Sequence, residues 1–155
     1  MPRTRKFLVV VDQTPECMVA LRFAARRAAR TQGGVTMLFV MPRAEMQHWL
    51  GVEEMMRAEA REAAEERLSG LAEEVRALAG VMPEFAIREG DPVEEVLAHL
   101  EEDPAIGVLV LGADAAGDNP GPLVSALVAK RGGRMPIPVT VVPGSLGLDE
   151  IDAIT

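Results

Sequence analysis

The sequence predicts a single α/β domain, a doubly wound five-stranded parallel sheet with helices on both faces. Short apolar runs alternate with longer amphipathic or capped segments along the chain, and this alternation is typical of a parallel sheet. The length of 155 residues suits one domain, and no linker or internal repeat divides it. Right-handed crossovers then leave few possible strand orders.

The first half of the chain predicts two strands and two helices. Residues 7–11 form a Val-rich apolar run, as in a strand buried on both faces of its sheet. Thr14 is the expected N-cap of a helix over 15–31, which has proline at its first position. A second strand is expected over 35–40. A long amphipathic helix is expected over 53–79, where apolar residues recur every three or four positions.

The second half continues the alternation. A third strand is expected over 84–89, and Asp91 caps a further helix in which Glu94 completes a capping-box spacing. A fourth strand over 107–112 precedes a Gly-, Asp- and Pro-containing loop and a helix over about 122–131. The fifth strand is expected over 137–142.

Composition and residue spacing exclude several functional classes. A net charge of −8 opposes binding to a nucleic-acid backbone, and 3% aromatic residues give few platforms for stacked bases. No apolar run approaches the roughly 18 residues of a membrane span. Cys17 is the only cysteine, His48 and His99 lack a second ligand at helical spacing, and no Ser-His-Asp set has a local signature. We therefore expect a cytoplasmic, non-enzymatic protein without a metal site.

A ligand cleft is expected where the strand order reverses, beyond the carboxyl ends of the strands. The first strand ends at Asp12 and the fourth at Gly112, so these residues line one cleft if the two strands are neighbours. A carboxylate there could accept a hydrogen bond from a ribose hydroxyl or a base amine. The Gly-containing loop over 112–125 leads into a helix N-terminus, which is an arrangement that can cradle phosphates.

Four segments of the chain carry a combined signal, and they read FLVVVDQTPECMVALRFAARRA, REGDPVEEVLAHL, VLVLGAD and IPVTVVP. Their order and spacing are more specific than any one of them, and together they resemble the universal stress protein family. The resemblance covers residues 6–143. It implies a Rossmann-like fold of the adenine nucleotide alpha hydrolase type over residues 1–143, followed by a C-terminal tail over 144–155.

The nucleotide-binding branch of that family carries a loop after the fourth strand with three glycines and a final Ser or Thr. Gly112 matches the first glycine, and Ser125 matches the final hydroxyl residue. Ala115 and Val124 stand at the other two glycine positions, so the backbone loses its freedom to approach a phosphate closely. Two aspartates in the loop would also repel a triphosphate. We therefore expect a degenerate loop and no required cofactor.

Two functional hypotheses follow. The first is a non-catalytic stress-response or signalling module that acts as a dimer and binds nucleotide weakly or not at all. The second is a switch that binds ATP or another adenine nucleotide through Asp12, the backbone near Val40, Gly112 and Ser125. Asp12 itself has two possible roles, contact with a nucleoside or a hydrogen bond to the adjoining loop and helix. Ser125 is more simply a surface or capping hydroxyl.

The fifth strand is predicted at a sheet edge, because no later strand exists to cover it. Antiparallel pairing of two such edges about a two-fold axis would give a homodimer through residues 137–142. The family resemblance implies the same interface. The alternative is a monomer in which the tail over 144–155 covers this edge. The tail is expected to be accessory to the core, although Leu148 and Ile151 are spaced to dock as one helical turn.

A soft apolar cluster surrounds the connection after the second strand, and an unknown protein partner could use it. Such a cluster either packs over the sheet edge or forms a lid or a partner surface. Its members are Met41, Met46, Trp49, Leu50, Met55 and Met56.

Overall fold

A computed structural model describes residues 5–43 and 50–155 of the chain. The expectations for Met46, His48, Trp49 and the side chain of Leu50 fall outside what it describes.

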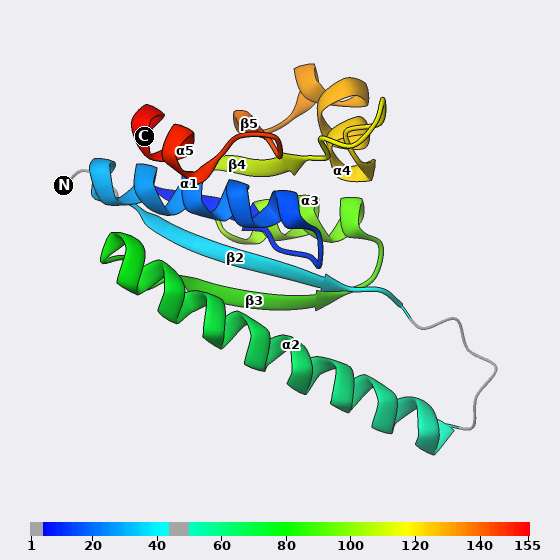
Figure 1. Ribbon diagram of the computed structural model, residues 1–155. Coiled ribbons are helices and arrows are strands. Elements are labelled where there is room, and N and C mark those ends of the chain that lie inside the picture. Colours follow the sequence, from blue (N-terminus) through cyan, green and yellow to red (C-terminus); the bar gives the residue numbers. More distant parts are fainter. Residues whose placement is uncertain (1–4, 44–49) are drawn as a thin grey trace.

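The five predicted strands form one parallel sheet in the order β3-β2-β1-β4-β5 (Figure 1). Their bounds differ from the predicted ones by at most two residues: β1 Lys6–Val10, β2 Gly34–Met41, β3 Glu84–Glu89, β4 Ile106–Ala113 and β5 Val139–Pro143. The order reverses between β1 and β4, which are direct neighbours in register Phe7–Val108 through Val9–Val110. This confirms the doubly wound α/β fold.

Helices cover both faces of the sheet (Figure 1). On one face lie α1 (Pro15–Thr31) and α2 (Leu50–Ala79), together with α5 (Leu148–Ile154). On the other lie α3 (Pro92–Glu102) and the short α4 (Pro122–Val124). Of the described helices, none is long and apolar enough to cross a bilayer.

Alternation along the strands builds two apolar layers. Val9 and Met37 are fully buried beneath α1 and α2, and Leu8 and Leu38 are fully buried on the opposite face. Both faces of β1 are thus covered, which explains why its sequence is a continuous apolar run. Four alanines of α1 are completely buried, and their small side chains let this helix lie close to the sheet.

Helix starts follow the sequence signals in part. The Asp91 side chain accepts a hydrogen bond from the Glu94 amide at 3.0 Å, as the capping pattern predicts. Thr14 occupies the N-cap position of α1, but its side chain makes no capping bond to the helix. The segment predicted as one helix over 122–131 is helical, but it is not a single α-helix. A π-helix over Ser125–Lys130 follows the first turn of α4.

The C-terminal tail contributes to the core, contrary to the expectation that it is accessory. Ile151 of α5 is fully buried in the apolar layer over α1. The Arg22 guanidinium of α1 holds the Asp152 carboxylate with two hydrogen bonds of 2.9 and 2.7 Å. The Arg22 hydrogen bond lowers the pKa of Asp152 below its usual range. The tail therefore docks as the seven-residue helix α5, through Ile151 and not through Leu148, which is exposed.

The fifth strand lies at the sheet edge, as predicted. Its one neighbour among the described strands is β4, so the outer backbone groups of β5 have no strand partner within the described chain. The tail packs α5 against α1 and adds no sixth strand.

Candidate functional site

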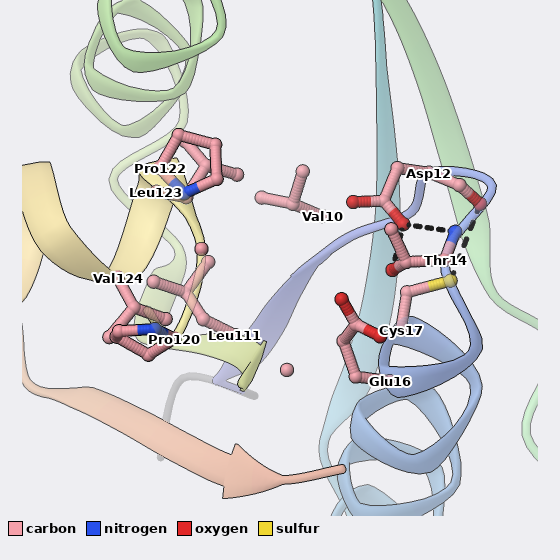
Figure 2. A pocket seen from close by; sticks show the side chains of 12 residues that line it. Val10, Asp12, Thr14, Glu16, Cys17, Leu111, Pro120, Pro122, Leu123 and Val124 are labelled. Atoms are coloured by element: carbon pink, nitrogen blue, oxygen red, sulfur yellow. Dashed lines mark hydrogen bonds between the residues drawn. The ribbon is translucent and has the colours of Figure 1, made fainter. Parts of the chain in front are cut away.

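A cavity of about 170 Å³ opens between the carboxyl ends of β1 and β4, where the strand order reverses (Figure 2). Its apolar walls come from Val10, Leu111 and the Pro120–Val124 segment, and its polar groups from the start of α1. The full lining is Val10, Asp12, Thr14, Glu16, Cys17, Leu111, Gly112, Pro120, Gly121, Pro122, Leu123 and Val124. This is the cleft that the sequence predicts.

Asp12 binds the loop that carries it. One carboxylate oxygen accepts hydrogen bonds from the Thr14 amide at 2.8 Å and from the Thr14 hydroxyl. Figure 2 shows the other oxygen of this carboxylate directed toward the cavity. The interpretation of Asp12 as a residue that binds loop amides is therefore confirmed, and its second oxygen is available to a ligand.

The backbone carbonyl of Asp12 is held from two directions. Arg67 of α2 donates to it from Nη2 at 2.6 Å, and the Cys17 thiol donates to it at 3.4 Å. Burial raises the pKa of the Cys17 thiol, so this side chain stays protonated. Cys17 is 2% exposed, in agreement with a small packed residue. The role of Arg67 was not foreseen, because its sequence position belongs to a Glu- and Arg-rich helix that resembles a solvated face.

Gly112 has a packing reason to be glycine. A Cβ atom at this position would lie 2.4 Å from the Glu16 carbonyl oxygen at the start of α1. A side chain would therefore push α1 away from β4. Since this constraint comes from helix–strand packing, Gly112 does not by itself indicate a phosphate site.

Side chains of the loop after β4 occupy two of its backbone amides. The Asp114 carboxylate accepts a hydrogen bond from the Ala116 amide at 2.8 Å. The Asn119 side-chain oxygen accepts from the Gly121 amide at 3.0 Å and from the Ser125 hydroxyl at 3.3 Å. These two amides therefore already have acceptors within the loop. The sequence gives no local signal for the contacts of Asn119, because they depend on the path of the loop.

The structure brings together some of the predicted site residues. Asp12 and Gly112 line the cavity, and so does Val124, which is 8% exposed and packs in the core. Val40 and Ser125 are absent from the lining among the described residues. Val40 packs against the α3 side of the sheet, while Ser125 bonds Asn119.

His99 lies on α3, away from this cleft. It is half-buried, and its Nδ1 atom is buried without a hydrogen-bond partner in the described structure. Burial lowers the pKa of His99, and the nearby Arg88 cation acts in the same direction. In the described parts of the chain, no group of three or more His, Cys, Asp or Glu residues is placed to hold a metal ion.

Comparison with known proteins identifies the family. The model of the universal stress protein family matches residues 3–143. The structure of universal stress protein UspA from Lactobacillus plantarum is 25% identical, with a TM-score of 0.70 over 92% of this chain and 99% of that one.

Two further solved structures are complexes with nucleotides. A universal stress protein from Archaeoglobus fulgidus in complex with dAMP is 17% identical, with a TM-score of 0.60 over 90% of this chain and 98% of that one. A universal stress protein in complex with cAMP is 18% identical, with a TM-score of 0.59 over 93% and 100%. No curated protein matches. The fold, the cleft at the strand reversal and the family match agree, and the chain belongs to the universal stress protein family.

Proposed function

We propose that this chain is a non-catalytic, cytoplasmic stress-response or signalling module that acts as a homodimer and does not hold a nucleoside triphosphate tightly. The family is generally a stress-response domain. The observation that carries the proposal is that Asp114 and Asn119 occupy amide donors of the loop after β4.

Phosphate loops bind their ligand through backbone amides that point at it and have no other acceptor. Here a phosphate would have to displace the Asp114 carboxylate from the Ala116 amide and the Asn119 oxygen from the Gly121 amide. Each displaced hydrogen bond is worth about 0.5–1.5 kcal/mol net. The Asp114 carboxylate would also repel the approaching phosphate. The loop therefore opposes polyanion binding both through the hydrogen bonds that would be lost and through charge repulsion.

The side chains at the former glycine positions reinforce this effect. Val124 is almost fully buried and packs with the α3 side of the core, so its side chain cannot leave the cavity wall without loss of apolar contact. Ala115 and the neighbouring Asp118 are exposed at the surface of the loop. The cavity that remains has apolar walls, and the carboxylates of Asp12 and Glu16 are in its lining.

Dimerisation through β5 is supported by its position and composition. The residues from 135 to 148 carry no charge, so the usual Lys that protects a sheet edge is missing. Val139 and Val141 face the α3 side of the sheet, while Val142 packs on the opposite side. Antiparallel pairing about a two-fold axis would satisfy the outer backbone groups of both copies. Members of the family commonly form dimers.

The second candidate function is an adenine-nucleotide-binding switch. It is favoured by the place of Asp12 and Gly112 in a cleft at the strand reversal, and by the dAMP and cAMP named for two solved relatives. In that case the free oxygen of Asp12 would accept from a ribose hydroxyl. Ser125 would have to leave Asn119 to reach a phosphate.

Co-purified nucleotide separates the two functions. The protein is purified without added nucleotide and denatured, and the released small molecules are quantified by mass spectrometry. The proposal predicts far less than one adenine nucleotide per chain. A stoichiometric amount that disappears in Asp12→Ala would replace the proposal by the nucleotide-binding switch. Asp91→Ala serves as a matched control, because Asp91 caps α3 outside the cavity lining.

A further inference from the structure

The amino-terminal half of α2 projects beyond the sheet (Figure 1). Several of its apolar side chains are exposed to solvent. The most exposed are Met55 at 64%, Met56 at 54% and Val52 at 47%. We call these three residues the α2 patch. The interpretation that Met55 and Met56 pack over the sheet edge is therefore wrong, and the alternative of a partner surface is the one that their exposure supports.

Little within the described structure covers this part of α2. Residues 54–63 are all exposed, and Ala64 is the first buried residue of the helix. At 1.5 Å per residue, the stretch ahead of Ala64 is about 20 Å long. Ion pairs of Arg57 with Glu53 and Glu89 tie the helix to the end of β3. Exposed ion pairs of this kind contribute only about 0–1 kcal/mol each.

Charge around the α2 patch narrows the choice of partner. Residues 53–66 contain six Glu and two Arg, which gives a net charge of −4. Glu54, Glu59 and Glu62 make no ion pair within the described chain. A second copy would bring an identical charge of −4 onto this one, and an anionic membrane would be repelled as well. A cationic partner is complementary instead.

We propose that the α2 patch docks a basic amphipathic helix of a partner protein. Apolar side chains on one face of that helix would pack on Met55 and Met56, whose unbranched side chains adapt to different partners. Lys and Arg at its flanks would pair with Glu59 and Glu62, which lie on the same side of α2 as the patch at helical spacing. Recognition of this type uses apolar anchors at helical spacing and a charged rim.

A synthetic helix tests the apolar part of the proposal. The probe is a fluorescent Leu/Lys amphipathic peptide of about five helical turns, and the control is the same peptide with Glu in place of Lys. Fluorescence anisotropy should show that the Leu/Lys peptide binds and that the control peptide with Glu does not. Met55→Gln/Met56→Gln should weaken this binding at least tenfold. Met82→Gln should leave it unchanged, because Met82 is equally exposed at 62% but lies outside the α2 patch.

A matched pair of charge variants tests the acidic rim. Glu59→Lys/Glu62→Lys and Glu101→Lys/Asp118→Lys change the net charge equally, and all four residues are exposed. The first variant should weaken peptide binding at least tenfold and the second less than threefold. Peptide addition should also slow hydrogen exchange over residues 52–60. Circular dichroism of each variant confirms that it is folded.

Three results would overturn the proposal. The first is no binding of the Leu/Lys peptide to the wild-type protein. The second is an equal loss of peptide affinity in both charge variants, which would mean that the effect comes from net charge alone. The third is a wild-type oligomer that dissociates in Met55→Gln/Met56→Gln, which would make a second copy the occupant of the α2 patch.

Discussion

Replacement of Ile151 by alanine should destabilise the protein strongly, although only four residues follow it in the sequence. Ile151 is 0% exposed and belongs to the apolar layer between α1 and the sheet. Truncation of a buried Ile to Ala costs about 2–5 kcal/mol, because apolar contact is lost and a cavity remains. At about 2–4 °C per kcal/mol for a domain of this size, a central value of about 3 kcal/mol lowers the melting temperature by about 6–12 °C.

Ile154→Ala provides the matched control, since Ile154 lies in the same helix and is 60% exposed. Differential scanning calorimetry should give a melting temperature close to the wild-type value for this variant. Urea unfolding at 25 °C gives the free energy of unfolding independently. Equal melting temperatures for Ile151→Ala and Ile154→Ala would refute the placement of α5 in the core and restore the tail as an accessory segment.

Three further predictions concern packing, pH and assembly. Gly112→Ala should lower the free energy of unfolding by about 1–3 kcal/mol in urea titrations, because its Cβ would meet the Glu16 carbonyl; Gly132→Ala, with open space around it, is the control. Burial lowers the pKa of His99 in the folded protein, so the neutral imidazole contributes fully to stability above the pKa of about 6.5 that it has in the unfolded chain. This contribution is lost as the pH falls through the pKa of His99 in the folded state. Between about pH 7.5 and pH 5, the free energy of unfolding should therefore fall less in His99→Gln than in the wild type. An equal fall in both proteins would contradict the burial effect. Val141→Lys on β5 should shift a dimer toward monomer in size exclusion with light scattering, whereas Met82→Lys, near the opposite edge of the sheet, should not; a monomeric wild type at tens of micromolar protein would remove the dimer.

The parallel sheet could be predicted because its signals are local. Each strand is a short apolar run, and proline follows Thr14 and Asp91 at the helix starts. The tail could not be predicted in the same way. In the sequence, Ile151 is a single apolar residue in an acidic segment. Its burial goes together with a contact between the neighbouring Asp152 and Arg22, which lies 130 residues before Asp152. Contacts of this kind follow from the assembled fold and not from a sequence window.

The candidate site shows the same division. Asp12 and Gly112 could be placed in one cleft because strand ends and a topological rule identify them. The sequence also indicated a degenerate loop from Ala115 and Val124. It did not indicate that Asn119 would bind both the Gly121 amide and the Ser125 hydroxyl, because that arrangement depends on the path of the loop. Arg67 was missed for a related reason, since its partner is a backbone carbonyl 55 residues away.

The central claim is that side chains of the loop after β4 occupy two of its backbone amides and that the loop does not hold a triphosphate tightly. Isothermal titration calorimetry with Mg-ATP tests this most directly, with the wild-type protein and Asp12→Ala measured side by side. The account predicts no saturable heat at micromolar ATP for either protein. A micromolar dissociation constant, equivalent to about −8 kcal/mol, that is lost in Asp12→Ala would contradict it.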